Sequence, residues 1–247
     1  MRICAVIPAA GRGSRLGIAQ PKILAPLNGR ETVWSVLHAK LAPLVDHIHL
    51  VLSPEGARDF PPLPPGVSQS IQAEPTGMGD AIFGARPSWK SFNAILIVWG
   101  DQVFVSEDTL RRVLAALISR EHQAVLPVTR TADPYVEYVF DGKRLTKVLQ
   151  SREGDQTAPN GFSDVGTFLL VTQGLAAAWN DYLSRDHSSG AARGGQTGEI
   201  NFLPFLPFLS ARGWTFTPLE VGDPTEARGI NTPEDLSFFR ERYKDAP

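Results

Sequence analysis

The first residues of the chain suit polyphosphate binding. An apolar run, Ile3 to Ile7, predicts a short buried strand that leads directly into a loop with Gly11, Gly13, Arg15 and Lys22. Glycine lets the backbone approach a ligand without obstruction by a Cβ atom, and free N–H groups after a strand favour anions. The cations would neutralise charge that develops during phosphoryl or nucleotidyl transfer. We therefore expect this loop to hold a polyphosphate.

Two common phosphate-binding patterns do not match this loop. A dinucleotide fingerprint needs a third glycine where the chain has Leu16, and Gly17 comes one residue late. A P-loop needs its lysine directly after a glycine, but Lys22 follows Pro21. Taken alone, the loop can also be interpreted as a glycine-rich connection with surface arginines.

A second segment with loop glycines follows in Gln72 to Ala81. Gly77 and Gly79 stand between an expected strand and an expected helix. Taken alone, this segment can be interpreted as a helix N-terminus with ordinary turn residues.

Two further segments place a polar residue next to the end of an expected strand or the start of an expected helix. Asp101 follows Ala94 to Trp99, the most apolar strand pattern in the chain, where open α/β sheets place their ligands. Asn231 lies within residues 226–235, just before the helix start signal Thr232-Pro233. Their plainer interpretations are a turn or cap aspartate and a loop that leads into a helix.

Together these motifs resemble those of the sugar-nucleotidyltransferase superfamily, whose signature reads G-x-G-[ST]-R…P-K. The match fixes six residues at defined spacing, namely Gly11, Gly13, Ser14, Arg15, Pro21 and Lys22. The second segment resembles Q-A-E-x-x-G-x-G-x-A, the nucleobase-reading segment of bacterial N-acetylglucosamine-1-phosphate uridylyltransferases. The resemblance to their uridylyltransferase domain extends over essentially the whole chain and is strongest in these motifs.

This resemblance implies a role for each matched residue. Arg15 would contact the departing pyrophosphate, and Lys22 the α-phosphate and the acceptor phosphate. Asp101 and Asn231 would hold Mg²⁺, which accepts a few oxygen ligands and keeps phosphate or water in its other positions. Gln72 would contact the edge of uracil. The residues implied to surround the nucleotide are Ala9, Ala10, Gly11, Gly13, Gln72 and Gly77.

The acceptor side departs from the family pattern at three places. Asp133-Pro-Tyr-Val-Glu137-Tyr stands for D-P-x-G-Y-G, Gln150 replaces the carboxylate of I-V-E, and Asp164-Val-Gly166 replaces N-T-G. In the family these places hold the N-acetylated sugar. We therefore expect an acceptor other than N-acetylglucosamine 1-phosphate, in a pocket lined by Glu137, Gln150, Asp164 and Gly166.

The implied reaction is attack by a phosphate oxygen of the acceptor on the α-phosphorus of a nucleoside triphosphate, with release of pyrophosphate. That oxygen is already anionic at neutral pH, so catalysis needs alignment and charge neutralisation and no general base. Transfer of UMP to a sugar 1-phosphate-like acceptor fits best. The alternatives are a cytidylyltransferase acting on a phosphonate or other non-sugar phosphate, and an inactive nucleotide-binding regulatory domain. The sequence leaves open UTP, dTTP or CTP, and the oligomeric state.

Composition and charge limit the kinds of partner that the protein is expected to bind. The formal net charge is −2 and no basic run interleaves with aromatic residues, so neither nucleic acid nor a membrane is an expected partner. No apolar run approaches the ~18 residues of a membrane span, and the first residues do not read as a signal peptide. The single cysteine, Cys4, allows no disulfide within the chain, which suits a reducing compartment. We expect the cytoplasm.

Strand and helix patterns alternate through the first half of the chain. Strands are expected over residues 3–7, 47–52, 68–72, 94–99 and 124–128, and helices over 33–41, 79–85 and 109–119. This alternation predicts an α/β fold, a three-layer αβα sandwich around a mostly parallel Rossmann-like sheet.

The second half carries different patterns. Asp141-Gly142 between two strand patterns predicts a hairpin, and with it a small antiparallel region on the acceptor side. Further expectations are a strand over 163–171, a helix over 173–183, a mobile loop over 184–198, a helix from 199, a strand over 215–221 and a final helix. At 247 residues the chain fits a single domain, with a nucleotide-binding part over about 1–128 and an acceptor-binding part over about 129–247.

Overall fold

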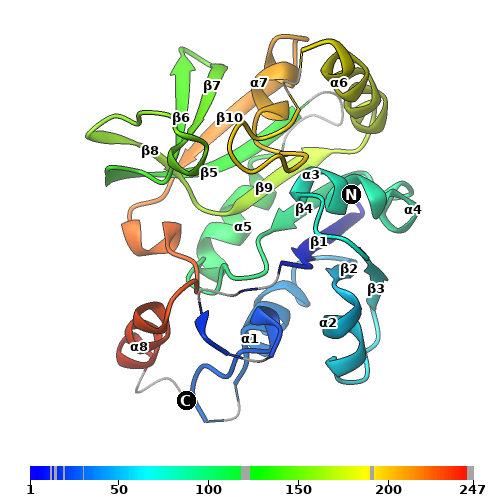
Figure 1. The fold of residues 1–247 in the computed structure, drawn as a ribbon, viewed down its shortest axis with the longest axis vertical. Helices are drawn as coiled ribbons and strands as arrows, with labels where there is room; N and C mark the ends of the chain where they lie inside the picture. Colours follow the sequence, from blue (N-terminus) through cyan, green and yellow to red (C-terminus); the bar gives the residue numbers. More distant parts are fainter. Residues whose placement is uncertain are drawn as a thin grey trace.

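The computed structural model describes residues 1–11, 13, 16–18, 20–29, 31–117, 123–189 and 192–243, without the side chains of 186–189. These residues form one mixed sheet of 10 strands with helices packed against it (Figure 1). The predicted α/β class and the mostly parallel sheet are confirmed. No helix within the described part of the chain is both long enough and apolar enough to cross a membrane.

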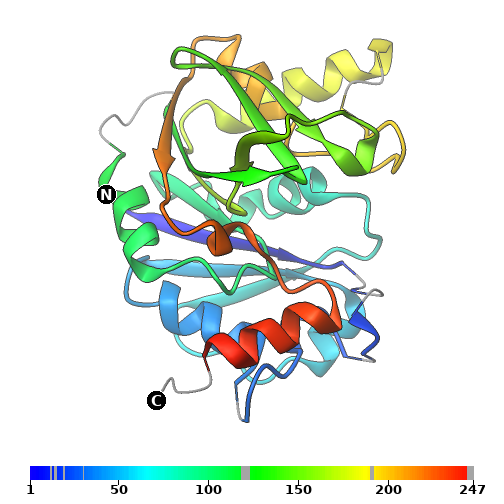
Figure 2. The same cartoon turned by 90° about the vertical axis from the view of Figure 1, so that its left-hand side faces the viewer.

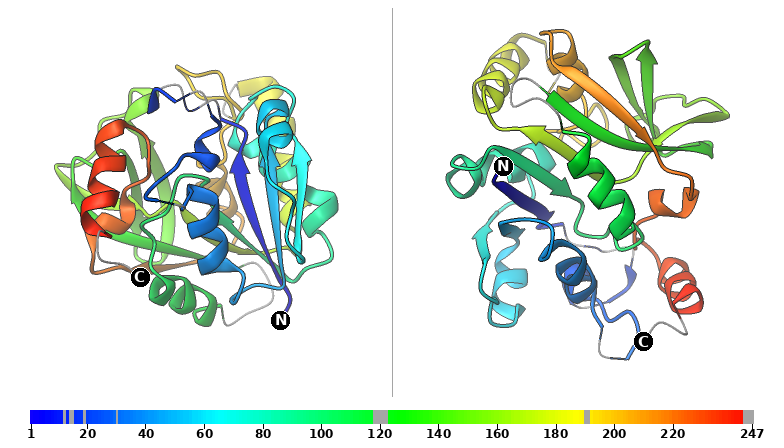
Figure 3. Two further views of the ribbon diagram at one scale, coloured as in Figure 1. Left: turned by 90° about the horizontal axis from the view of Figure 1, so that it is seen from below. Right: turned by 180° about the vertical axis from the view of Figure 1, so that it is seen from behind.

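The sheet has the strand order β3-β2-β1-β4-β9-β5-β8-β6-β7, and β10 pairs with β5 beside this path. Its strands are β1 (Ile3–Ala9), β2 (His47–Leu52), β3 (Val67–Ile71), β4 (Ala94–Val98), β5 (Gln123–Ala132), β6 (Val136–Asp141), β7 (Arg144–Gln150), β8 (Asn160–Asp164), β9 (Thr167–Val171) and β10 (Thr215–Glu220). Strands β7, β8 and β9 run opposite to the others, as their antiparallel pairings require. The two strands β10 and β5 lie side by side and parallel, as Figure 3 shows from behind.

The helices pack against this sheet and cover its strands. They are α1 (Val33–Leu41), α2 (Pro54–Asp59), α3 (Met78–Gly84), α4 (Arg86–Trp89), α5 (Glu107–Ala115), α6 (Leu175–Ser189), α7 (Phe205–Ser210) and α8 (Pro233–Arg242). Short 3-10 helices lie at Lys22–Leu24 (η2), Ser151–Glu153 (η3) and Pro224–Ala227 (η4). The hairpin of β6 and β7 and the helix α8 lie at opposite ends of the molecule (Figures 1 and 2).

The first half forms the predicted strands and helices with shifts of a few residues at their ends, and it also contains α2 and α4, which were not predicted. All five residues of β4 are buried, and β1 lies parallel between β4 and β2. Helix α1 begins at Thr32, whose side chain accepts from the Ser35 N–H while the Ser35 hydroxyl accepts from the Thr32 N–H. This reciprocal capping box satisfies two backbone donors at the helix start. The expected helix over 33–41 is confirmed to the residue.

The predicted strand over 163–171 is wrong as a single element. The chain forms β8 and β9 instead, and Gly166 between them has a φ of +64° that ends the first strand. Strand β8 pairs with β5 and β6, whereas β9 inserts antiparallel between β4 and β5. Pairing between strands far apart in sequence decides this arrangement, and the local pattern carries no trace of it.

Two further expectations for the second half are corrected. Helix α6 extends to Ser189, so the first part of the predicted 184–198 loop is helical. No helix begins at Glu199, because residues 199–204 are irregular and α7 begins at Phe205. The predicted hairpin at Asp141-Gly142 and the strand from Thr215 are confirmed.

Candidate active site

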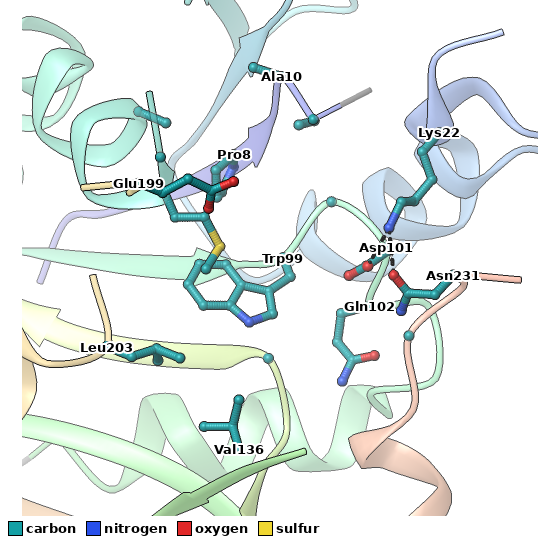
Figure 4. A pocket seen from close by; sticks show the side chains of 18 of the residues that line it. Pro8, Ala10, Lys22, Trp99, Asp101, Gln102, Val136, Glu199, Leu203 and Asn231 are labelled. Carbon is teal, nitrogen blue, oxygen red and sulfur yellow. Dashed lines mark hydrogen bonds and ion pairs between the residues drawn. The ribbon is translucent and has the colours of Figure 1, made fainter. Parts of the chain in front are cut away.

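A cavity of about 330 Å³ opens where strands β1 and β4 end, and both halves of the chain contribute to its wall (Figure 4). The residues predicted for the site that line it are Ala9, Ala10, Gly11, Lys22, Gln72, Gly77, Asp101, Gln150, Asp164, Gly166 and Asn231. Of the other described residues predicted for the site, Gly13 and Glu137 are not part of the wall. Arg15 lies outside the described residues.

Three segments far apart in the sequence meet at one point of this cavity. Lys22 stands at the start of η2, Asp101 follows β4, and Asn231 precedes α8. The Lys22 Nζ lies 2.7 Å from Asp101 Oδ2 and 2.9 Å from Asn231 Oδ1 (Figure 4). Both oxygens therefore face a single positive charge, so the two side chains predicted to bind a metal converge.

These convergent oxygens suit a hard divalent cation. Mg²⁺ takes oxygen ligands and often uses only one or two protein groups, with phosphates and waters in its remaining positions. Within the described ranges, no group of three or more His, Cys, Asp or Glu side chains is arranged to hold a metal. The Asp101 and Asn231 oxygens, which face the Lys22 ammonium, could supply the protein ligands of such a cation. Phosphate oxygens and waters would then occupy its remaining coordination positions.

Glycines permit close approach around this point. A Cβ on Gly100 would lie 2.9 Å from the Ala9 Cβ, so a larger residue would push the ends of β1 and β4 apart. Gly13 has a φ of +59°, and a Cβ there would lie 3.1 Å from the Lys22 Cβ. Gly13 therefore packs against the Lys22 side chain, in a backbone conformation that favours glycine.

Buried side chains fix the loop that carries Asn231 at both of its ends. Glu226 is 6% exposed and accepts a hydrogen bond from the Thr109 hydroxyl at 3.1 Å. The Gln102 Nε2 donates to the Glu226 carbonyl oxygen at 2.7 Å. At the other end, Asp235 accepts from the Asn231 N–H at 2.8 Å. These contacts hold Asn231 beside the segment that follows Asp101.

The segment from Gln72 to Ala81 packs against a distant segment around Ile200. The Gly79 N–H donates to the Ile200 carbonyl at 3.0 Å, and the Ile200 N–H donates to the Thr76 carbonyl at 2.8 Å. Gly77 has a φ of +131°, and a Cβ there would lie 2.4 Å from the Ile200 oxygen. Gly77 is thus required by both the backbone conformation and this close contact.

Asp164 brings a buried carboxyl group to the other side of the cavity. It is 9% exposed at the end of β8, and its Oδ2 has no hydrogen-bond partner among the described residues. Burial raises the pKa of Asp164 to about 7, the charge of Asp101 adds to this, and hydrogen bonds from Gly166 and Trp99 oppose it. Near neutral pH the group can therefore exist as an acid or as a carboxylate.

Gln150 and Glu137 have different surroundings. Gln150 lines the cavity, and its Oε1 accepts from the Asn201 Nδ2 at 2.8 Å. On β6, Val136 lines the cavity, whereas the Glu137 carboxylate accepts from the Ala158 N–H at 2.7 Å. Successive side chains of a strand point to opposite faces. The sequence motif located this strand without indicating which of its faces meets the cavity.

Further cavity residues lie outside the set predicted from the sequence, namely Trp99, Gln102, Tyr135, Arg152 and Glu199. Arg152 Nη2 lies 2.7 Å from Glu199 Oε2. Trp99 directly precedes Gly100 and Asp101, so its place in the sequence could have predicted that it lines the cavity. The Arg152–Glu199 pair joins residues 47 positions apart, and no local pattern connects them.

The mostly parallel mixed sheet, with a cavity at the ends of β1 and β4 that is bordered by glycines and Lys22, is that of a nucleotidyltransferase with a Rossmann-like fold. The profile of the MobA-like NTP transferase domain matches residues 5–165. The chain belongs to this family, and the resemblance to the sugar-nucleotidyltransferase superfamily is confirmed. It is 29% identical over 244 residues to the bifunctional protein GlmU of Acidithiobacillus ferrooxidans, with 97% of this chain and 51% of that protein covered. The chain spans about half the length of the curated relatives it matches.

Solved structures share the fold over nearly the whole chain. HddC from Yersinia pseudotuberculosis has a TM-score of 0.67 at 19% identity, covering 97% of this chain and 99% of that one. The 4-diphosphocytidyl-2C-methyl-D-erythritol synthase of Anaerococcus prevotii has a TM-score of 0.64 at 15% identity, covering 98% and 96%. At these identities the similarity defines the fold alone.

Proposed function

We propose that the protein transfers UMP from UTP to a sugar 1-phosphate-like acceptor and releases pyrophosphate. The observation that carries this proposal is the convergence of Lys22, Asp101 and Asn231 at the end of the first glycine-rich loop. A charged acceptor phosphate needs no general base, so a site with cations and oxygen ligands is sufficient for the reaction.

The residues divide the work of alignment and charge neutralisation. Lys22 supplies positive charge for the α-phosphate and the acceptor phosphate, and Arg15 for the departing pyrophosphate. Asp101 and Asn231 would hold Mg²⁺, which when bound neutralises phosphate charge. The backbone of residues 9–11, which borders the cavity, would follow the phosphates. Gln72 and Gly77 would border the nucleobase.

The acceptor would occupy the cavity beside Gln150, Asp164 and Gly166. A carboxyl group stands at Asp164, and the amide at Gln150 is already bonded to Asn201. Both differ from the residues that hold the N-acetylated sugar in the resembling family. We therefore propose an acceptor other than N-acetylglucosamine 1-phosphate.

A pyrophosphate-release screen tests this function. The four ribonucleoside triphosphates and dTTP are each combined with sugar 1-phosphates, including N-acetylglucosamine 1-phosphate, and with non-sugar phosphates and phosphonates. We expect release with UTP and a sugar 1-phosphate. Efficient use of N-acetylglucosamine 1-phosphate would contradict the proposed acceptor, and no release with any pair would leave the inactive regulatory domain as the better description.

The second candidate function is transfer of CMP to a non-sugar phosphate. It is supported by the similarity to a protein named for a diphosphocytidyl product and by the altered acceptor segments. Release with CTP in place of UTP in the same screen would favour it. Retention of Lys22, Asp101 and Asn231 in one cluster supports either transferase over the inactive domain.

A further inference from the structure

The amide orientation of Gln72 is set by its neighbours. Its Nε2 lies 2.9 Å from Asp80 Oδ2, 3.2 Å from the Gly77 carbonyl oxygen and 3.1 Å from Thr76 Oγ1. A carboxylate and a carbonyl can only accept hydrogen bonds, so the NH₂ group of the amide must face them. The carbonyl oxygen of Gln72 then points away from these groups.

Asp80 is the residue that joins this network together. It lies in the first turn of α3, and its Oδ2 accepts from the Thr76 hydroxyl at 2.5 Å as well as from Gln72. Gln72 lines the cavity, whereas Asp80 is not part of its wall. Asp80 can therefore act on a ligand only through the side chain that it orients.

We propose that Asp80 is a positioning residue for nucleobase selection, because it holds the Gln72 oxygen as an obligate hydrogen-bond acceptor toward the base. This inference rests on the proposed function. An amide that is free to rotate can offer either a donor or an acceptor, but this one has its NH₂ group engaged. A pyrimidine base must then present a donor, which is the N3–H of uracil or thymine or the N4 amino group of cytosine.

Two uridine nucleotides that differ by one donor test this proposal. In 3-methyl-UTP a methyl group replaces the N3 hydrogen, while both ring carbonyls are kept. The wild-type enzyme should lose kcat/KM with this analogue by about tenfold or more, because the Gln72 oxygen is left without a partner. In Asp80→Ala the Gln72 amide can rotate. The kcat/KM for UTP should therefore fall more than the kcat/KM for the analogue, so the ratio between the two should become smaller.

Two further variants separate positioning from a general structural effect. Asp80→Asn keeps an oxygen that accepts from Gln72, and it should restore most of the discrimination. Asp108→Ala removes a carboxylate from the first turn of α5, where Asp108 forms an ion pair with Arg112. Because Asp108 is not part of the Gln72 network, this variant should leave the discrimination unchanged. Thermal unfolding of all variants shows whether each remains folded.

The outcomes distinguish failure of this inference from failure of the proposed function. If Asp80→Ala lowers kcat/KM equally for UTP and 3-methyl-UTP, Asp80 has no positioning role and the inference is overturned. If the wild-type enzyme releases no pyrophosphate with any nucleotide, the proposed function fails. If CTP is the substrate, the 2-pyrimidinone nucleotide, which lacks the N4 amino donor, replaces 3-methyl-UTP and the same comparison decides.

Discussion

The Lys22 ammonium lies where two distant segments of the chain meet at the cavity. Its ammonium contacts two oxygens that no local sequence pattern connects, since Asp101 and Asn231 stand 79 and 209 residues from it. Neither oxygen needs Lys22 for the folding of its own segment, because Asn231 is held through Asp235 and the Asp101 carbonyl accepts from the Ile230 N–H. Because these segments are held in place without Lys22, its ammonium is available to a ligand that carries several negative charges.

Removing either charge should impair turnover without unfolding the protein. We expect Lys22→Ala and Asp101→Ala to lower kcat by roughly two to three orders of magnitude, as loss of preorganised charge does in other enzymes. Lys143→Ala, in the exposed turn between β6 and β7, is the matched control and should retain full activity. Near-normal turnover in both site variants, with the acceptor found in the screen, would exclude the assigned roles.

Asp164 should give the stability of the protein a distinctive pH dependence. Its folded pKa of about 7 lies above the ordinary value of 3.8, so between these limits the folded state binds more protons than the unfolded state. Stability from this group is therefore complete below about pH 4 and is lost as the pH rises toward 7, by at most about 1.4 kcal/mol per pH unit.

The measurement is urea unfolding between pH 4 and pH 8. Asp164→Asn should remove this contribution to the slope, whereas Asp108→Asn, at an exposed position, should retain it. Equal slopes in the wild-type protein and in Asp164→Asn would show that the buried carboxyl does not hold its proton.

The sequence identified cavity residues that stand in local motifs, and it did not identify contacts between segments far apart in the chain. Lys22 and Asp101 stand in motifs whose spacing is local, so they could be found without a structure. The engagement of Gln72 by Asp80 depends on how a strand–loop–helix turn closes. The Arg152–Glu199 pair depends on the meeting of two distant loops. Such contacts follow from tertiary packing and leave no period or spacing in the chain.

The same division holds for helices and strands. Helix α1 and strand β4 were predictable because a cap and an unbroken apolar run are local signals. The pair β8 and β9 was not, because the residue types over 163–171 do not determine which distant strands each half pairs with. The end of α6 was also misplaced, since a polar, serine-rich composition suggested a loop while the chain continues as helix to Ser189.

Two glycines at the two ends of α3, Gly77 just before it and Gly84 in its last position, should respond oppositely to substitution. Gly77→Ala places a methyl group against the Ile200 carbonyl at a φ of +131°, so we expect a loss of about 1–3 kcal/mol in stability and weaker nucleotide binding. Gly84→Ala lies in α3 with open space around its Cβ, so it should be neutral or stabilise by up to about 1 kcal/mol.

Chemical unfolding and a nucleotide titration check this pair. Because both changes add one methyl group within the same short segment, a general sensitivity of the segment would affect them alike. Equal effects would mean that the contact between Gly77 and Ile200 does not constrain the loop.

At the scale of the whole molecule, the cavity wall is complete only when segments from both ends of the chain are folded together. The cavity wall runs from Pro8 in β1 to Asn231 before α8, with Gln150 and Asp164 from the antiparallel region between them. Unfolding any of these parts would take the wall apart. A ligand in this cavity therefore binds the folded state and contributes its binding free energy to global stability.

Thermal unfolding with nucleotide measures this coupling. At a UTP concentration of 100 times its Kd, with Mg²⁺ present, binding should add about 2.7 kcal/mol, which for a domain of this size raises Tm by roughly 5–11 °C. In Asp101→Ala the part of the shift that depends on Mg²⁺ should disappear, because that variant lacks one of the two oxygens that face Lys22. Lys143→Ala should keep the full shift. A full, Mg²⁺-dependent shift in Asp101→Ala would contradict the proposed role of the Asp101 carboxylate as a ligand of the ion.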